Sequence, residues 1–538
     1  MRPNQVGGHA AIALLEAYGV DTVFGIPGVH TLELYRGLAD RKMRHIGVRH
    51  EQGAGFMADG YARVSGRPGV CFIITGPGMT NIATAMAQAY ADSIPMLVIS
   101  AVNALGQIGS GEGWLHELQD QRQLVKQVSA FSHTVMTPAE LPKVVARAFA
   151  VFAGGRPRPV HIELPLDIIT APADKLPPIR AIVPPSPPAA SPTALQKAVD
   201  WLNSAKAPVL LLGGGAQDAG PFVRALAEKL DAPTVMSVNG RGLLPPGHPL
   251  AVSCSPSMPP TMKLIESADV ILAIGTEFGS TDYDWFEQGG AKFNGKCIRI
   301  DIDAQQIVRT KQPDLPIIAD ASEAVAALVP LVSPAKRDGA PRASATRDAV
   351  LGDLSRVYRA GLHLMETVRD TLPGVVLVGD SAQPVYAGVI SYPSAAPRSW
   401  FCSATGYGTL GYALPAAIGA QLAAPERPVV CLIGDGGLQF TIQELASARE
   451  AETPVIVLLW NNNGYGEIKT YMVSRQIHPI GVDIFTPDFQ MIGKGFGCEV
   501  VKLKKASDLP GLLREATKRK TATIIEIDED DYVANFAG

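Results

Sequence analysis

The chain has 538 residues and a formal net charge of −4 at pH 7, so it lacks the basic field that nucleic-acid binding requires. No apolar run approaches the length of about 20 residues that spans a bilayer. The six cysteines are scattered without C-x-x-C or metal-ligand spacing, and we expect buried thiols in a reducing compartment. The N-terminus lacks the apolar core of a signal peptide, which favours a cytoplasmic enzyme.

The first predicted domain, residues 1–170, alternates helices with short buried strands. A helix over Gly8–Tyr18 precedes a strand at Thr22–Ile26, and further strands are predicted at His45–Arg49 and Gly69–Thr75. The last strand ends in GPG, which opens another helix. This alternation predicts an α/β domain whose strands are parallel.

Two polar, proline-rich segments divide the rest of the chain. The first composition break covers Leu164–Pro192. Its proline-rich part, APADKLPPIRAIVPPSPPAASP, cannot form a packed core, so it is predicted to be a stiff linker. The second predicted linker covers Ser333–Arg347. Residues 191–333 and 348–538 are then predicted to form a central and a last α/β domain. The chain as a whole is predicted to contain three doubly wound α/β domains with mainly parallel sheets.

The segment from Val429 to Gly464 organises the last domain. A buried strand is predicted at Val429–Gly434, a helix at Leu438–Ala451 and a second buried strand at Pro454–Trp460. Strand, helix and strand within about thirty residues predict a βαβ unit, whose two strands are parallel.

Polar groups gather at the predicted carboxyl edge of this unit. Asp435 follows the first strand, and three asparagines at 461–463 follow the second. Ligands of open α/β sheets bind at this edge. A carboxylate, an amide oxygen and a loop carbonyl suit Mg²⁺ shared with phosphate oxygens, and Gly436 and Gly437 allow close approach of an anion. The alternative is a pair of ordinary turns, because Gly, Asp and Asn are common turn residues.

The GDG, helix and NN succession resembles the diphosphate motif of thiamine-diphosphate enzymes. The order of the three domains resembles acetolactate synthases and pyruvate decarboxylases, which implies a pyrimidine-binding, a central and a diphosphate-binding domain. By this resemblance the metal ligands are the side chains of Asp435 and Asn462 and the carbonyl of Gly464. It also implies further cofactor contacts at Gln383, Gly434, Gly436 and Gly437.

The segment RHEQGAGFMADGYAR resembles the part of the same family that carries the activating glutamate, which implies this role for Glu51. Activation of the cofactor requires a carboxyl group that hydrogen-bonds its aminopyrimidine ring and shares a proton with it. The alternative is a glutamate that stabilises the start of a helix through the macrodipole.

The segment Gly406–Gly411 matches G-x-G-x-x-G and taken alone would suggest a dinucleotide fold. That interpretation is weak, because Cys431 stands where the later ribose-binding acid is expected. The loop resembles the family segment that bends the cofactor. The resemblance implies that the Gly408 carbonyl contacts the pyrimidine and that Leu410 is an apolar wedge between the two rings. Acetolactate synthases usually place Met at this wedge, whereas some decarboxylases place Leu.

Two histidines are candidates for proton transfer and substrate binding. His30 follows a Pro-Gly turn at the end of a predicted strand, and His116 lies in GWLHELQDQ, where acetolactate synthases carry Gln. The alternatives are a structural histidine and a surface loop residue.

Four further residues concern the choice of substrate. Glu467 and Tyr471 fall where acetolactate synthases carry an apolar pocket residue and a Trp. Asp282 and Asp284 lie in a segment that carries arginine in those enzymes. Carboxylates near the channel would favour a cationic substrate tail. Ordinary solvated acidic loops are the alternative.

Three segments of the first domain look especially like those of bacterial 5-guanidino-2-oxopentanoate decarboxylases. They are GVDTVFGIPGVHTLELYRGL, RHEQGAGFMADGYARV and CFIITGPGMTNIATAMAQAYADSIPMLVIS. The resemblance implies non-oxidative decarboxylation of a 2-oxo acid with thiamine diphosphate and Mg²⁺, in a homodimer or homotetramer. The first alternative is an acetolactate synthase catalytic subunit. A second is a non-catalytic scaffold or regulator, which would be expected to have lost Glu51 or Asp435. FAD is not expected, because SCSPS from Ser253 replaces the family's contact segment, although GGGA and GTEF in the central domain could serve a nucleotide.

Overall fold

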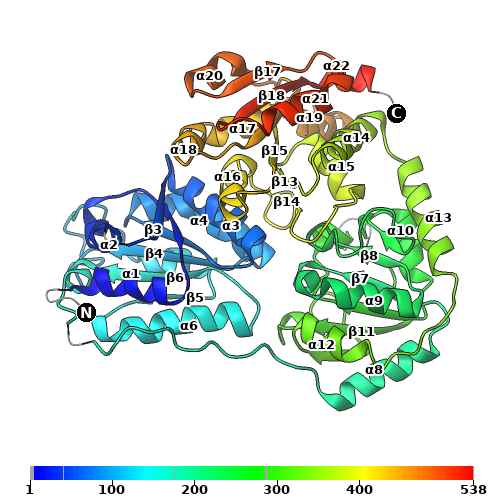
Figure 1. Ribbon diagram of the computed structural model, residues 1–538, viewed down its shortest axis with the longest axis horizontal. Helices are drawn as coiled ribbons and strands as arrows, with labels where there is room; N and C mark the ends of the chain where they lie inside the picture. The colour runs from blue at the N-terminus through cyan, green and yellow to red at the C-terminus, as the bar shows by residue number, and fades with distance from the viewer. Residues whose placement is uncertain (1–4, 40, 175, 285–288, 537–538) are drawn as a thin grey trace.

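The computed structural model describes residues 5–39, 41–174, 176–284 and 289–536. Within these residues three six-stranded sheets follow one another along the chain, and every neighbouring strand pair is parallel. The predicted class of three doubly wound α/β domains is confirmed. In Figure 1 the N-terminal domain (blue to cyan) and the central domain (green) lie below the C-terminal domain (yellow to red).

The N-terminal sheet has the strand order β2-β1-β3-β4-β6-β5. Its strands are β1 Thr22–Gly25, β2 Arg44–Gly47, β3 Gly69–Ile73, β4 Met96–Val102, β5 Phe131–Thr134 and β6 Val160–Pro165. Its helices are α1 Gly7–Ala17, α2 Leu32–Leu38, α3 Glu51–Ser65, α4 Pro77–Asp92, α5 Gln121–Lys126, α6 Leu141–Gly154 and α7 Leu166–Ile169, with 3₁₀ turns η1 Val29–Thr31 and η2 Pro138–Glu140.

The central sheet has the order β12-β11-β10-β7-β8-β9. Its strands are β7 Val209–Leu212, β8 Thr234–Met236, β9 Ala251–Val252, β10 Val270–Ile274, β11 Lys296–Asp301 and β12 Leu315–Ile318. Its helical elements are α8 Pro192–Ser204, η3 Gly214–Ala219, α9 Gly220–Leu230, η4 Val238–Gly240, α10 Pro259–Glu266, α11 Ser280–Tyr283, η5 Gln306–Val308 and α12 Ala321–Leu328; α13 Gly339–Gly352 leads out of the domain.

The C-terminal sheet has the order β14-β13-β15-β16-β18-β17. Its strands are β13 Val376–Gly379, β14 Trp400–Cys402, β15 Val429–Gly434, β16 Ile456–Asn461, β17 Glu499–Lys502 and β18 Thr523–Asp528. Its helical elements are α14 Arg356–Thr371, α15 Gln383–Ser391, α16 Ala413–Ala423, α17 Asp435–Thr441, α18 Glu444–Glu450, α19 Gly466–Ser474, α20 Phe489–Gly495, η6 Ala506–Asp508, α21 Leu509–Ala516 and α22 Glu529–Asn535.

Each sheet reverses its winding direction at a point near its middle. The change falls between β1 and β3, between β7 and β10, and between β13 and β15. Ligands of doubly wound sheets bind at the carboxyl ends of the strands that flank this point. The chain therefore offers three such edges, and every residue predicted from a strand-end motif lies on one of them.

Two predicted elements differ from the structure. Ser333–Arg347 is not linker throughout, because α13 begins at Gly339 and its Ala343 and Val350 are buried against the central domain. The predicted helix Leu438–Ala451 is two helices, α17 and α18, that break at Ile442 and Gln443. The hydroxyl of Thr441 donates to the Gly411 carbonyl at 2.8 Å, which fixes the end of α17 on a neighbouring loop.

The N-terminal and C-terminal domains share a hydrophobic core where α3 crosses α16 (Figure 1). The two backbones approach so closely that a Cβ at Gly60 would lie 2.0 Å from the Ala416 carbonyl oxygen. A Cβ at Gly419 would lie 1.9 Å from the Met57 carbonyl oxygen. Glycine at both positions is required for this crossing, which joins the two domains firmly.

All six cysteines are buried with free thiols, as their scattered spacing predicts. Burial raises the pKa of Cys498 to about 11 and raises that of Cys431 well above its ordinary value. Among the described helices, none is both long and apolar enough to cross a lipid bilayer.

Candidate active site

Four neighbouring strands of the C-terminal sheet end in polar side chains. Asp380 follows β13, Asp435 follows β15, Asn462 follows β16 and Glu529 follows β18. Asp435 is 1% exposed, and burial raises the pKa of its carboxyl group although the Thr486 hydroxyl donates to Oδ2 at 3.1 Å. These side chains form one polar rim on the carboxyl edge of the sheet.

The start of α17 and the loop that follows β16 lie against each other. A Cβ at Gly436 would lie 2.6 Å from the Tyr465 ring, one residue after Gly464. The amide nitrogen of Asn462 donates to Glu529, so Oδ1 is the end of this amide left for a metal. No group of three or more His, Cys, Asp or Glu residues suited to a metal occurs in the part of the chain that the structure describes. A metal here would be held by mixed carboxylate, amide and carbonyl oxygens, which is a donor set for Mg²⁺.

Asp380, which no sequence motif indicated, anchors the loop that contains Gly408 and Leu410. Its Oδ1 accepts the backbone N–H of Gly411 at 3.2 Å, and its Oδ2 accepts that of Ala413 at 2.9 Å. Burial raises the pKa of Asp380 to about 6 against the effect of these hydrogen bonds. Gly408 is exposed with φ +75°, and no atom lies within 4 Å of where its Cβ would be.

Glu51 is the first residue of α3 in the N-terminal domain and is 8% exposed. Asn81 on α4 donates to its Oε2 at 2.9 Å. His50 caps the helix by accepting the N–H of Gln52 at 3.2 Å. Glu444 of the C-terminal domain accepts the N–H of Arg49 at 3.1 Å, so a buried carboxylate of one domain fixes the chain next to Glu51 in the other.

The structure brings His30 and His116 together although they lie far apart in the sequence. Their rings stack with centroids 5.5 Å apart and an interplanar angle of 29°. Neither Nδ1 atom has a hydrogen-bond partner among the described residues, and both atoms are buried. Burial lowers the pKa of His30, and the neighbouring His116 lowers it further. The pair therefore offers two ring nitrogens without a protein partner, which a bound ligand could use.

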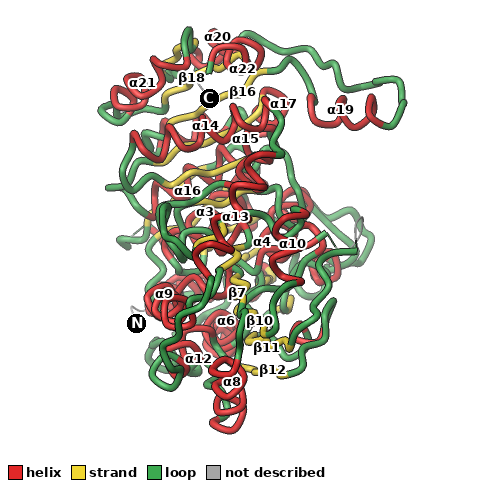
Figure 2. Tube along the Cα trace, turned by 90° about the vertical axis from the view of Figure 1, so that its right-hand side faces the viewer, coloured by secondary structure: helices red, strands yellow, loops and turns green. Residues whose placement is uncertain are grey.

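Glu467 and Tyr471 lie on α19, directly after the Asn462 loop. Glu467 Oε1 accepts a hydrogen bond from the Tyr358 hydroxyl on α14 at 3.0 Å. The charge of Glu467 also raises the pKa of Tyr386 on α15, after the larger effect of burial. Tyr471 is half exposed, and Figure 2 shows α19 at the edge of the molecule, away from the sheets. The carboxylate of Glu467 thus lies among tyrosine side chains.

Comparison with known proteins agrees with this geometry. Residues 5–124 match the N-terminal TPP binding domain of thiamine pyrophosphate enzymes, residues 195–328 their central domain and residues 378–527 their C-terminal TPP binding domain. The chain is a thiamine pyrophosphate enzyme.

Several curated relatives match this thiamine pyrophosphate enzyme over nearly its full length. The probable 2-ketoarginine decarboxylase AruI of Pseudomonas aeruginosa is 46% identical over 98% of the chain and 95% of its own length. The acetolactate synthase isozyme 1 large subunit of Escherichia coli is 34% identical over the same shares. The acetolactate synthase large subunit of Corynebacterium glutamicum is 33% identical over 98% of the chain and 88% of its own length.

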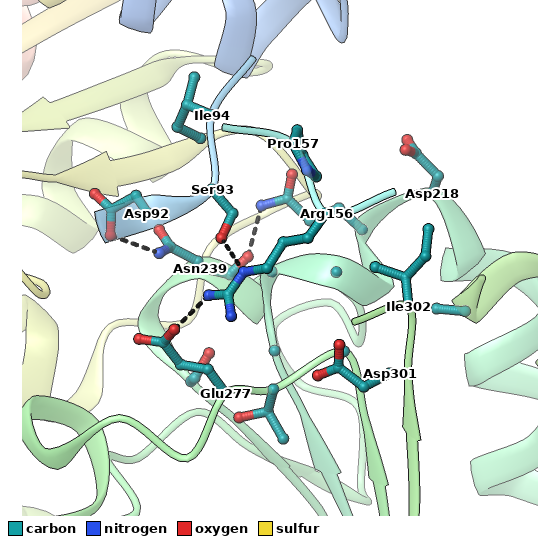
Figure 3. Close-up of a pocket in the computed structure, with 18 of the residues that line it drawn as sticks. Asp92, Ser93, Ile94, Arg156, Pro157, Asp218, Asn239, Glu277, Asp301 and Ile302 are labelled. Carbon is teal, nitrogen blue, oxygen red and sulfur yellow. Dashed lines mark hydrogen bonds and ion pairs between the residues drawn. The ribbon is translucent and has the colours of Figure 1, made fainter. Parts of the chain in front are cut away.

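A cavity of about 620 Å³ lies at the carboxyl edge of the central sheet of this thiamine pyrophosphate enzyme (Figure 3). Arg156 reaches into it from the N-terminal domain and donates to Ser93 at 2.8 Å and to Glu277. The carboxyl group of Asp282 lines this cavity, and burial raises its pKa to about 7. Asp282 lies at this cavity, whereas Glu467 lies on α19 of the C-terminal domain, so their joint effect on a cationic substrate stays a prediction.

Proposed function

We propose that the protein is a thiamine-diphosphate- and Mg²⁺-dependent decarboxylase of a 2-oxo acid whose far end is positively charged, such as 5-guanidino-2-oxopentanoate. The observation that carries the proposal is the Glu467 carboxylate, one helical turn from the Asn462 loop and hydrogen-bonded to Tyr358 at 3.0 Å. A carboxylate among tyrosine rings suits a planar cation, which can pair with the charge and lie against aromatic faces. The name of the relative AruI points to the same class of substrate.

The residues present fit the cofactor. Asp435, Asn462 Oδ1 and the Gly464 carbonyl would hold the metal, and Gln383, Gly434, Gly436 and Gly437 would contact the diphosphate. When bound, thiamine diphosphate supplies the nucleophilic carbon and the electron sink for loss of CO₂. The exposed backbone of Gly408 and the side chain of Leu410 lie on the loop that Asp380 anchors, where they can support the bend of the cofactor.

The remaining candidate residues, Glu51, His30 and His116, would take part in proton transfer and hydrogen bonding. Glu51 would hydrogen-bond the aminopyrimidine ring, and the 2.9 Å bond from Asn81 holds its second oxygen. Burial and the neighbouring His116 lower the pKa of His30, which favours its neutral ring at pH 7, so His30 can accept a proton or a hydrogen bond from the bound ligand. His116, stacked on it, would donate a hydrogen bond to the substrate carboxylate or to the product. Carbon–carbon bond formation with a second oxo acid, as acetolactate synthases perform, is the second candidate outcome, which the 34% identical relative favours.

We also propose that the central cavity does not hold FAD tightly. Its three lining arginines are already paired: Arg63 with Asp92, Arg156 with Glu277 and Arg398 with Asp218. The N–H groups of Gly213 and Gly215 are bonded to backbone carbonyls at 3.0 Å, so neither is free for a diphosphate. The segment from Ser253 packs on the end of α15, where the Ser255 N–H donates to Ile390 at 2.7 Å.

We further propose a cytoplasmic homodimer or homotetramer. Several large apolar side chains on α19 and the loop that follows it are exposed, and a cluster of this kind is typical of a subunit interface. They are Ile468, Val473, Ile477, Ile480 and Phe485.

The substrate proposal is tested with a panel of 2-oxo acids, assayed for CO₂ and aldehyde in the presence of Mg²⁺ and thiamine diphosphate. A hydrogen bond between charged partners is worth roughly 1.5–3 kcal/mol, which corresponds to about ten- to hundredfold in specificity. We therefore expect Glu467→Gln to lower kcat/KM for 5-guanidino-2-oxopentanoate by this factor while leaving that for uncharged 2-oxohexanoate nearly unchanged.

The matched control is Glu499→Gln, an exposed glutamate of the same domain, which should change neither value. If the wild type prefers pyruvate and accumulates acetolactate, the decarboxylase proposal is wrong and acetolactate synthesis takes its place.

A further inference from the structure

Glu529 contacts the candidate metal ligand Asn462, although the diphosphate motif does not include it. It is the first residue of α22, immediately after β18. The parallel register pairs Trp460 with Ile527 and Asn461 with Asp528, so the next residues of the two strands are Asn462 and Glu529. The structure joins them, because Asn462 Nδ2 donates to Glu529 Oε2 at 3.0 Å.

We propose that Glu529 is a positioning residue that fixes the side-chain amide of Asn462 with its oxygen presented to the metal. The inference rests on the metal site of the proposed function. It concerns a residue that acts on a ligand and does not itself touch the metal.

The chemistry of the amide is what makes such a residue useful. An asparagine amide has an oxygen end, which can bind a cation, and an NH₂ end, which cannot. A half-turn about the last side-chain bond exchanges the two ends. A carboxylate can only accept hydrogen bonds, so it binds the NH₂ end and leaves the oxygen for the metal. Partners of this kind orient metal ligands in many proteins.

Glu529 is itself held in place by neighbours on the same edge. Trp460 Nε1 donates to Glu529 Oε2 at 2.6 Å from the buried indole of β16. The amide of Gln383, at the start of α15, adjoins both Asn462 and the Glu529 carboxylate. Glu529 thus has three polar neighbours, Trp460, Gln383 and Asn462, and the last of these is the candidate metal ligand.

The same edge contains a natural comparison. Asn461 Nδ2 donates to Glu526 Oε1 at 2.9 Å, which is a second asparagine held by a second glutamate of the same β18 segment. Asn461 is not a candidate ligand. Substitution of Glu526 therefore reproduces the chemical change and its position in the fold without reaching the metal.

The test measures metal affinity rather than turnover. Mn²⁺ is titrated into the full-length protein in the presence of thiamine diphosphate, and free Mn²⁺ is measured by electron paramagnetic resonance. Glu529→Gln offers an NH₂ group that can pair with Asn462 Oδ1 and turn it away, so we expect about a 10- to 100-fold loss of Mn²⁺ affinity. Glu526→Gln should bind Mn²⁺ like the wild type, and high Mn²⁺ should restore turnover in Glu529→Gln.

The outcomes separate the two proposals. Wild-type affinity in Glu529→Gln, with affinity lost in Asp435→Ala, overturns the positioning role and leaves the metal site in place. Wild-type affinity in Asp435→Ala overturns the metal site itself. Equal losses in Glu529→Gln and Glu526→Gln mean that the edge as a whole has loosened, which also overturns the positioning role. If Glu529→Gln does not fold, as judged by thermal unfolding, Glu529→Asp takes its place, since it keeps the charge but withdraws the carboxylate by one methylene group. A loss of Mn²⁺ affinity in Glu529→Asp then supports the positioning role, and wild-type affinity overturns it.

Discussion

Asp380 shows how one buried carboxyl group can shape a cofactor site without a place in any motif. It accepts backbone N–H groups from Ser381 at 2.9 Å, Gly411 at 3.2 Å and Ala413 at 2.9 Å. These bonds tie the loop that contains Gly408 and Leu410 to the end of β13. An asparagine at 380 would place an NH₂ group against one set of these donors.

We predict that Asp380→Asn weakens thiamine-diphosphate binding, because an unsatisfied buried donor costs about 1–3 kcal/mol and the loop would shift to relieve it. This corresponds to a loss of about ten- to hundredfold in affinity, measurable by calorimetric titration with Mg²⁺ present. Asp488→Asn is the control: Asp488 caps α20 by accepting the Met491 N–H at 2.9 Å, and Asn caps helices equally well. Equal affinities in all three proteins would show that the loop does not depend on Asp380.

The candidate site residues that could be predicted from sequence are those whose motif lies at the end of a strand or the start of a helix. Asp435, Asn462 and Glu51 each follow a predicted strand or begin a predicted helix, and the structure places them there. Asp380 and Glu529 also follow buried strands directly, so a search for polar residues at every strand end would have found them. The stacking of His30 on His116 depends on tertiary packing, which local patterns do not contain.

The crossing of α3 and α16 is the element on which the relative position of two domains depends. Both helices run through the core shared by the N-terminal and C-terminal domains. Glu51 begins α3, and α16 begins at Ala413, directly after the loop that contains Gly408 and Leu410. A change in the distance between the two helices would therefore move the pyrimidine-side and diphosphate-side candidates relative to each other.

We predict that Gly60→Ala lowers the midpoint of thermal unfolding, because its Cβ would lie 2.0 Å from a backbone oxygen that has no freedom to move. Overpacking of a core typically costs about 1–3 kcal/mol. The control is Gly511→Ala in α21, where no atom lies within 4 Å of the new methyl group and the helix should gain slightly. An unchanged midpoint in Gly60→Ala would mean that the crossing relaxes easily.

The boundaries of an element could be predicted from the sequence where a single pattern, such as a short apolar run, marked it. The buried strand β15 lies at the predicted residues, because Val429–Gly434 is a short run of apolar side chains. The split of α17 from α18 was missed because both helices keep the same apolar spacing. The break is stabilised by contacts with a distant loop and with the backbone of Arg49, just before α3. The start of α13 was missed because its polar composition resembles that of a linker.

At the scale of the whole molecule, the candidate residues lie on the edges of two different domains. Asp435 and Asn462 belong to the C-terminal sheet, and Glu51 belongs to the N-terminal domain. The proposed homodimer would let these edges meet across two chains, and the exposed apolar residues around α19 would then be covered.

We predict that two inactive variants complement each other. Glu51→Gln lacks the proposed activating carboxylate, and Asp435→Ala lacks the proposed metal carboxylate. After subunit exchange, a mixed dimer contains one site with both carboxylates intact, so activity should return to part of the wild-type value. Mixtures of either variant with itself are the control. A fully active monomer in sedimentation would contradict the shared site.

The buried thiols can report which domain of this protein unfolds first. Cys71 lies in the N-terminal sheet, Cys254 and Cys297 lie in the central domain, and the remaining three lie in the C-terminal domain. Buried thiols with raised pKa values react slowly with alkylating reagents. A cysteine that becomes labelled during gentle heating therefore identifies the domain that has just exposed its interior. Peptide mapping of the label would give the order in which the three domains come apart, without any probe added to the chain.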